Sequence, residues 1–321
     1  MDNDLVTKLR NKIDSATNIQ IISHIRPDGD AISSIIAFGL ALIEVGKQVQ
    51  MISSDGVPTA LRYLPDWNQI NKKISEPVDL IIALDCADRE RLGSGIDSET
   101  NIDVCIDHHI TNTNFADLNL VVPDAVATCA ILARLIPELG IQITPSIAEA
   151  LLVGILADSQ GFRTLNTNAE ALRTAADIVE LGANLPDLYF RTLVNRSFEA
   201  TRYWGAGLGK LQSDNGVVWT RLSLDDRKKA NYHGKDDADL INVLSAINEM
   251  QIAVIFVEQD PQKVKVSWRG SDGVDVASIA AQFGGGGHVA AAGAMIEGTL
   301  DEVQKIVIKT TQKIFEQVSE I

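Results

Sequence analysis

The chain has 321 residues, a formal net charge of −15, and 45% hydrophobic and 22% charged residues. This composition excludes a mostly disordered chain, a collagen-like chain and a coiled-coil rod, and the length suits two domains. The acidic excess argues against binding to long duplex nucleic acid, because phosphate binding depends on clustered Lys and Arg. A small phosphorylated ligand could still bind at a local basic site or through metal ions.

The amino-terminal residues and the cysteines favour a cytoplasmic protein. The chain begins with the acidic segment 1–5, which lacks the apolar core of a secretory signal. The three cysteines, Cys86, Cys105 and Cys129, lie in apolar stretches, which favours reduced, buried thiols over disulfides. No apolar run approaches the roughly 18 residues that a membrane span needs, so no membrane partner is expected.

The first half of the chain alternates apolar strands with helices. Strands are expected at 19–23, 49–52, 78–84 and 104–106, and helices at 4–17, 30–46, 126–139, 145–156 and 170–182, with Asp30 as the cap of the second helix. The strands are almost unbroken runs of Val, Ile and Leu, which is typical of strands buried on both faces. We therefore predict an α/β domain over residues 1–186, with a mainly parallel sheet flanked by helices.

The second half repeats this alternation on a smaller scale. Residues 187–214 are expected to form a helical connector, because their pattern is helical but polar and contains arginines. Beyond it we expect strands at 217–222, 252–258, 263–268 and 292–297, and helices at 236–247, 275–282 and 299–318. These elements predict a second, smaller α/β domain over residues 215–321.

Acidic and imidazole side chains follow three of the apolar strands in the first half. The residues concerned are His24, Asp28 and Asp30, then Asp85, and then Asp107 and His108, while Asp158 closes an apolar helix. The carboxyl ends of parallel strands meet at one edge of a sheet, and this edge is where open α/β sheets bind ligands. If the three strands are neighbours, these side chains crowd together.

Crowded carboxylates repel one another unless a proton or a cation relieves the repulsion. The four carboxylates and two imidazoles that follow the strands suit two divalent cations, and mixed oxygen and nitrogen ligands favour Mn²⁺ or another borderline first-row metal. The lack of clustered cysteines argues against structural zinc. A single Asp after a strand is usually a helix cap or a turn residue, but the recurrence at three strands favours the metal site.

A run of glycines at Gly284–Gly287 offers a possible anion site in the second half. Glycines allow a ligand to approach the backbone closely and several N–H groups to point at an anion, although an isolated run is more typical of a loose turn. The guanidinium of Arg269 suits a terminal phosphate, but it could equally be a solvated residue at a strand end. The expected substrate-binding residues are Arg269, Gly285, Gly286, Gly287 and His288, with Arg163 near the metal site. We expect them to hold the substrate end remote from the scissile bond, across a cleft between the domains.

These motifs resemble, in order and spacing, those of the DHH phosphoesterase superfamily. The matching strings are His24-x3-Asp28-x-Asp30-Ala31, Asp85, Asp107-His108-His109 and Asp158. The segment 284–293 and the string Ser267-Trp268-Arg269 are similar to elements of the associated DHHA1 substrate domain. The resemblance covers most of residues 1–190 and continues into the second half. It is strongest to the small members that act as oligoribonuclease (nanoRNase) and 3′-phosphoadenosine-5′-phosphate (pAp) phosphatase.

The resemblance implies a role for each motif residue. One Mn²⁺ would be held by His24 and Asp28, the other by Asp30, His108 and Asp158, with Asp85 bridging the two. The implied catalytic residues are Asp85, His109, which would reach the substrate phosphate, and Asp107, which would orient an imidazole. The two ions, for which Mg²⁺ or Co²⁺ could substitute, would generate a hydroxide that attacks phosphorus in line.

The implied substrates are short single-stranded RNA oligonucleotides, cleaved to mononucleotides, together with dinucleotides and pAp. The chain could also form a homodimer. Three other functions stay open: a phosphodiesterase acting on cyclic or linear dinucleotides, an inorganic pyrophosphatase, and a non-catalytic nucleotide-binding regulator. The pyrophosphatase branch carries a Ser-Arg-Lys-Lys-Gln element, whereas the segment 227–229 lacks the flanking Ser and Gln. A regulator would have lost metal ligands, but all of the family ligands are present.

Overall fold

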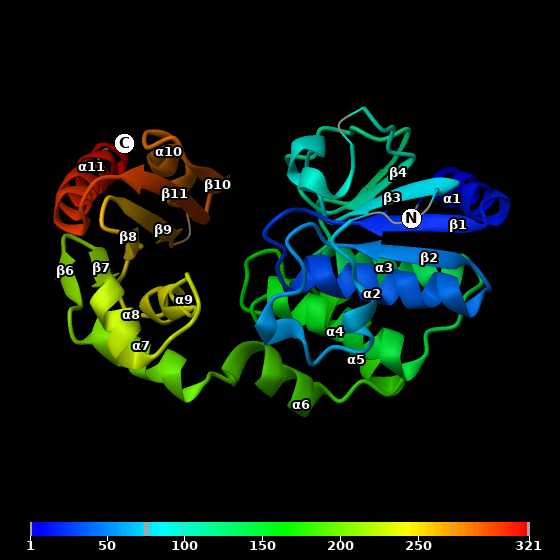
Figure 1. The fold of residues 1–321 in the computed structure, drawn as a ribbon, viewed down its shortest axis with the longest axis horizontal. Coiled ribbons are helices and arrows are strands. Elements are labelled where there is room, and N and C mark those ends of the chain that lie inside the picture. Colours follow the sequence, from blue (N-terminus) through cyan, green and yellow to red (C-terminus); the bar gives the residue numbers. More distant parts are fainter. Residues whose placement is uncertain (1, 74–76, 98, 272, 320–321) are drawn as a thin grey trace. The chain divides into compact units, whose positions relative to one another are not determined.

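The computed structural model describes residues 2–73, 77–97, 99–271 and 273–319 (Figure 1). The chain divides into two compact units, Met1–Asn195 and Arg196–Ile321, and each unit has its own sheet. The first sheet has five parallel strands flanked by helices, and the second unit is a smaller α/β unit. The predicted fold class is therefore confirmed, while the finer division of the chain at residues 186 and 214 stays a prediction.

The first sheet has the strand order β2-β1-β3-β4-β5, and every adjacent pair is parallel. Its strands are β1 Asn18–Ile22, β2 Gln48–Ile52, β3 Leu80–Leu84, β4 Val104–Asp107 and β5 Leu118–Val121. Every residue of β3 and β4 is buried, as their unbroken apolar runs predict. The edge strand β5 was not expected, because it is short and only every second residue is buried. The strand order places the ends of β1, β3 and β4 next to one another.

The described residues of this unit form six α-helices. They are α1 Asn3–Ser15, α2 Gly29–Glu44, α3 Thr128–Glu138, α4 Pro145–Asp158, α5 Ala169–Glu180 and α6 Leu185–Tyr189, the last followed by a π-helical turn, Phe190–Val194. Figure 1 shows α2, α3 and α4 together along one face of the sheet. Side chains of these helices and of the sheet form the large apolar core of the unit. On the opposite face, Leu92 of the 3₁₀ segment Arg89–Gly95 joins a smaller cluster with Ile22 and Ile52.

The start of α2 differs from the expectation that Asp30 caps this helix. Asp28 is the N-cap residue, and its Oδ1 accepts hydrogen bonds from the backbone N–H groups of Asp30 and Ala31, at 3.1 and 3.0 Å. The helix begins at Gly29, one residue earlier than expected, so Asp30 lies in the first turn. Its side chain is thereby turned into the interior, where it is 1% exposed.

The second unit contains a six-stranded sheet of order β10-β11-β9-β8-β7-β6, in which only β7 and β8 are parallel. Its strands are β6 Gln212–Asp214, β7 Val217–Leu222, β8 Ile252–Asp260, β9 Lys263–Gly270, β10 Gly286–His288 and β11 Ala291–Glu297. Its helices are α7 Phe198–Leu208, α8 Leu224–Ala230, α9 Leu240–Leu244, α10 Val276–Ala281 and α11 Leu300–Ser319. One apolar cluster joins the sheet to α10 and α11, and a second joins it to α7, α8 and α9.

The short strands β6 and β10 of the second unit were not expected from the sequence, and two of its helices differ from the expectation. The charged segment 227–229 lies on α8, a helix that starts with a capping box between Ser223 and Asp226 and buries only Ala230. Such a helix lacks an apolar stripe, so hydrophobic periodicity does not reveal it in the sequence. The helix predicted at 236–247 is limited to α9. Across both units, none of the helices formed by described residues is long and apolar enough to cross a membrane.

Gly154 on α4 lies where three helices meet, and Gly154→Ala tests this packing. An added Cβ would come within 2.2 Å of Cys129 Sγ and 2.6 Å of Asp30 Oδ1. Both neighbours are buried, so we expect the free energy of unfolding to fall by about 1–3 kcal/mol, as for other overpacked cores. Urea unfolding measures the change.

The matched control is Gly205→Ala on α7, where an added Cβ meets nothing within 4 Å. At this exposed helical position, alanine should be neutral or stabilise the helix by up to about 1 kcal/mol. Equal unfolding free energies for the two variants would contradict the packing described for α4.

Candidate metal centre

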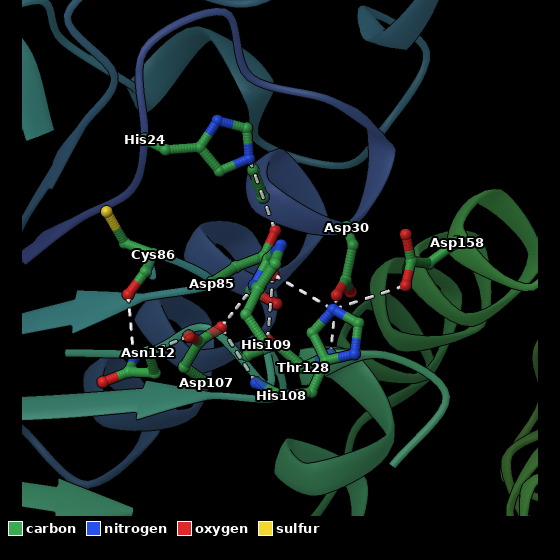
Figure 2. A network of polar contacts seen from close by, with 12 residues as sticks. His24, Asp30, Asp85, Cys86, Asp107, His108, His109, Asn112, Thr128 and Asp158 are labelled. Carbon is green, nitrogen blue, oxygen red and sulfur yellow. Dashed lines mark hydrogen bonds and ion pairs between the residues drawn. The ribbon is translucent and has the colours of Figure 1, made fainter. Parts of the chain in front are cut away.

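The predicted acidic and imidazole side chains converge at the carboxyl edge of the first sheet. His24 follows β1, Asp85 follows β3, and Asp107 ends β4 and leads into His108. Asp30 from α2 and Asp158 from the end of α4 point into the same space (Figure 2). The convergence depends on the strand order, because β1, β3 and β4 are adjacent.

Three groups of these side chains are compact enough to hold a metal ion. They are His24, Asp28 and Asp85; Asp30, His108 and Asp158; and Asp85, His108 and His109, with the potential ligand atoms of each group within 4.8 Å of one another. Asp85 and His108 each belong to two groups. The structure thus brings together all six residues that the sequence predicted as metal ligands, and adds His109.

The orientation of two imidazoles fits a bound cation. Nδ1 of His24 lies 2.8 Å from the carbonyl oxygen of Ile25, and Nδ1 of His108 lies 3.2 Å from that of Ala125. A carbonyl oxygen can only accept, so Nδ1 carries a proton in both rings, and Nε2 is the atom that presents a lone pair whenever the ring is neutral.

Each Nε2 faces carboxylate oxygens rather than a donor. Nε2 of His24 lies 3.6 Å from Asp85 Oδ2, and Nε2 of His108 lies 3.4 Å from Asp158 Oδ2. These distances exceed a hydrogen bond, and two lone pairs that face each other repel. A shared divalent cation, or an additional proton on each ring, relieves the repulsion. The oxygen and nitrogen donors therefore fit a metal centre, with backbone carbonyls fixing the ligand tautomers as in other histidine metal sites.

Asp85 lies at the centre of the site and has an unusual backbone. Its φ of +54° is in the left-handed region, which costs a non-glycine residue about 1–3 kcal/mol and is concentrated at functional sites. Its Oδ2 faces His24, whereas its Oδ1 lies 3.6 Å from Nε2 of His108. Burial favours a higher pKa for Asp85, but the surrounding histidines outweigh it and hold the pKa below the usual range.

Asp30 is held by the amino-terminal end of α3. Its Oδ2 accepts a hydrogen bond from the backbone N–H of Thr128 at 2.6 Å, and its Oδ1 accepts one from Cys129 at 3.0 Å. The N-cap residue of α3, Ala127, has no capping side chain, so Asp30 supplies the cap from another helix. Burial raises the pKa of Asp30 well above its usual value, and the charges of Asp85 and Asp158 raise it further.

Two further groups retain protons near neutral pH when no cation is bound. Burial raises the pKa of Asp158 to about 7, against the opposing charge of His108. Burial would lower the pKa of His108, but the nearby carboxylates, Asp85 first, raise it to about 9. The positive charge that the cluster needs is therefore supplied by protons until a cation replaces them.

Buried Asp107 and partly buried His109 form a pair beside this cluster. Oδ1 of Asp107 accepts hydrogen bonds from Nδ1 of His109 at 2.7 Å and from the backbone N–H of His108 at 2.8 Å. Its Oδ2 accepts one from Nδ2 of Asn112 at 2.6 Å. Asn112 Nδ2 also donates to the carbonyl of Cys86, so it links the segments that follow β3 and β4 (Figure 2). Asp107 thereby fixes the orientation of the His109 ring.

The sequence reasoning missed two residues of this network, Asn112 and Thr128. Asn112 lies in a Thr- and Asn-rich loop of ordinary composition, and Thr128 lies within a predicted apolar helix. Arg163, which was expected near the site, is exposed in the turn after α4 and bonds Oε1 of Gln160 at 2.7 Å. Within the described ranges, no hydrogen bond or ion pair joins Arg163 to the metal cluster.

The predicted substrate-binding residues of the second unit lie on neighbouring strands. Arg269 of β9 pairs with Ala291 of β11, and β11 pairs in turn with β10, which contains Gly286 and Gly287. At Gly287, where φ is +149°, an added Cβ would lie 2.4 Å from the carbonyl oxygen of Ala291, so only glycine fits. Arg269 is partly buried, and its Nε has no hydrogen-bond partner among the described residues.

The remaining two predicted residues, Gly285 and His288, lie at the two ends of β10. Gly285 immediately precedes β10, and an added Cβ there would lie 2.3 Å from the carbonyl oxygen of Gly293. His288 is the last residue of β10, and its side chain lies outside the described part of the structure. The substrate-binding role of all these residues stays a prediction.

Comparisons with known proteins match both halves of the chain. Residues 18–155 match the family model for the DHH family, N-terminal domain, and residues 214–316 match the DHHA1 domain. The chain is 33% identical to the bifunctional oligoribonuclease and PAP phosphatase NrnA of Thermus thermophilus, covering 92% of this chain and 89% of the relative. It is 26% identical to the protein of the same description from Mycoplasma genitalium, covering 96% and 98%.

A solved structure shares the fold over almost the whole chain. It is an exopolyphosphatase-related protein from Bacteroides fragilis, with a TM-score of 0.88 and 23% sequence identity, covering 98% of this chain and 96% of that protein. At this identity the likeness concerns the fold alone.

The centre holds protons when no cation is bound. We therefore predict that its affinity for metal ions depends on pH. A cation must displace protons from His108, whose pKa is about 9, and from Asp158, whose pKa is about 7. Raising the pH removes these competitors, so Mn²⁺ affinity should increase from pH 6 to pH 9. The increase should be steeper below pH 7, where both groups are protonated, than above it.

Titration calorimetry with Mn²⁺ in two buffers of different ionisation enthalpy measures both the affinity and the protons released. At pH 7.5 we expect net release of protons on binding. Affinity that is constant from pH 6 to pH 9, with no proton release, would contradict the proposed competition.

Proposed function

This chain belongs to the DHH family and carries its DHHA1 domain, and we propose that it degrades short RNA oligonucleotides to mononucleotides and dephosphorylates pAp. It is a phosphoesterase, as its family membership and its curated relatives indicate. Those relatives, described as bifunctional oligoribonuclease and PAP phosphatase, match this chain over nearly its full length. The observation that carries the proposal is the convergence of imidazole nitrogens and carboxylates at one sheet edge.

We propose that the site holds two divalent cations. One would be bound by His24 and Asp28, the other by Asp30, His108 and Asp158, and Asp85 would be shared. Support comes from the compact groups His24, Asp28 and Asp85 and Asp30, His108 and Asp158. Sharing of Asp85 is supported by its two oxygens, which lie 3.6 Å from Nε2 of His24 and 3.6 Å from Nε2 of His108. Mn²⁺ is the proposed ion because the donors are oxygen and imidazole nitrogen, a set that also suits Co²⁺ and, less well, Mg²⁺.

The cations and the protein groups would divide the chemistry between them. When bound, the cations would neutralise the carboxylates, orient a phosphate and make a water acidic enough to attack phosphorus. His109, oriented by the buried carboxylate of Asp107, would in its protonated form donate a hydrogen bond from Nε2 to the phosphate as charge develops there. The two carboxylate oxygens of Asp85 would point at different histidines, one at His24 and the other at His108. Asp85 would thereby fix the positions of these ligands relative to each other.

The second unit would bind the part of the substrate that does not react. Arg269 offers a planar, charged guanidinium, which suits a phosphate, and Gly286 and Gly287 are exposed, so that a ligand could approach their backbone. His288 and Arg163 remain part of the proposed substrate-binding set on sequence grounds.

A substrate panel with Mn²⁺ tests the proposed function. The panel contains pAp, RNA of two to five nucleotides, a cyclic dinucleotide and pyrophosphate. We expect release of inorganic phosphate from pAp and of mononucleotides from the short RNAs. A metal-loaded protein that leaves both pAp and dinucleotides intact would contradict the proposal, as would a preference for pyrophosphate or the cyclic dinucleotide.

The variant Asp85→Asn tests the shared ligand. Loss of a carboxylate at the centre of the cluster should lower kcat by more than the roughly 10–100-fold typical of outer residues around a metal site. Asp177→Asn on α5 changes an exposed carboxylate in the same way and serves as the control. Turnover by Asp85→Asn at the rate of the control would exclude the assigned role.

A further inference from the structure

Thr128 contacts carboxylates from different ligand groups of the metal centre. It is the first residue of α3 and its side chain is fully buried. Its Oγ1 donates a hydrogen bond to Asp85 Oδ1 at 3.1 Å, and its backbone N–H donates to Asp30 Oδ2 at 2.6 Å. We propose that Thr128 is a positioning residue that fixes the Asp85 carboxylate and ties it to Asp30 before cations bind. This inference rests on the proposed metal centre.

The Asp85 carboxylate needs such a partner to select its orientation. The histidine nitrogens around Asp85 lie 3.6–3.7 Å from its oxygens, beyond hydrogen-bond distance. Thr128 Oγ1 is closer and contacts Oδ1, the oxygen that faces His108, so Oδ2 is left facing His24. The hydroxyl of Thr128 therefore determines which oxygen of Asp85 faces His24 and which faces His108.

The position of Thr128 in α3 explains why its hydroxyl is available. Within a helix, a Thr hydroxyl often donates to the carbonyl four residues earlier. At the first helical position, that carbonyl belongs to the preceding loop rather than to a helical turn. A buried hydroxyl without an acceptor is costly, so Asp85 is the acceptor that satisfies it.

The backbone of the same turn holds Asp30. The N–H groups of Thr128 and Cys129 each donate to one oxygen of Asp30. The first turn of α3 thus contacts Asp85, which belongs to the group containing His24, and Asp30, which belongs to the group containing Asp158. Because a helical turn is rigid, the two carboxylates keep a fixed relation without a bound cation.

Thr128→Val and Thr128→Ser separate the hydroxyl from the rest of the residue. Valine keeps the shape and the backbone N–H but removes the donor, whereas serine keeps the donor. We expect Thr128→Val to weaken Mn²⁺ binding about 10–100-fold, the range seen when outer partners of metal ligands are lost. It should lower kcat for pAp by a similar factor with little change in KM. Thr128→Ser should restore both values to within about threefold of the wild type.

Thr220→Val is the matched control. Thr220 lies on β7, is also fully buried, and donates its hydroxyl hydrogen bond to the carbonyl of Gly207. This variant should lose stability as Thr128→Val does, but it should bind Mn²⁺ like the wild type. Equal Mn²⁺ affinity in Thr128→Val and the wild type, or equal losses in the two valine variants, would overturn the proposal.

Mn²⁺ binding is measured by calorimetry without substrate, so the result does not depend on the reaction. A wild type that binds Mn²⁺ but leaves pAp intact would contradict the proposed function and leave the positioning role to be decided by the binding data. If Thr128→Val does not fold, Thr128→Ala and Thr128→Ser replace it. Serine must then bind Mn²⁺ at least about tenfold more tightly than alanine, and equal affinities would overturn the role of the hydroxyl.

Discussion

Repulsion among buried carboxylates and imidazole lone pairs is the constraint on which the rest of the structure depends. Nε2 of His24 and of His108 face carboxylate oxygens at 3.6 and 3.4 Å, while their Nδ1 atoms are committed to backbone carbonyls. The arrangement is stable only with positive charge between these groups. Protons provide it in part, as the raised pKa values of His108 and Asp158 show, and divalent cations would provide it more completely.

The scaffold holds this unfavourable cluster in place through the backbone more than through side chains. Adjacent parallel strands bring the three loops to one edge, and the first turn of α3 donates two N–H groups to Asp30. Asp85 keeps a left-handed conformation that costs free energy by itself. The large apolar core around α2, α3 and α4 offsets such local costs, which is how proteins commonly keep strained functional sites.

The sequence was sufficient to predict four of the five strands of the first sheet and the converging residues, because unbroken apolar runs identify buried parallel strands and their ends locate the site. It could not reveal Thr128 or Asn112, since their roles depend on contacts between distant segments that leave no periodic signal. The cap of α2 was assigned to Asp30 instead of Asp28, because helix starts are uncertain by a residue or two. The edge strand β5 and the charged helix α8 lack the patterns that sequence reasoning uses.

The most direct measurement of the central claim is anomalous diffraction at the manganese absorption edge from crystals grown with Mn²⁺. We expect two anomalous peaks at the carboxyl edge of the first sheet. One should lie within bonding distance of His24 Nε2, the other within bonding distance of His108 Nε2, and both close to Asp85. A single peak, a peak bonded to other residues, or imidazoles that keep facing the carboxylates with no metal between them would contradict the account.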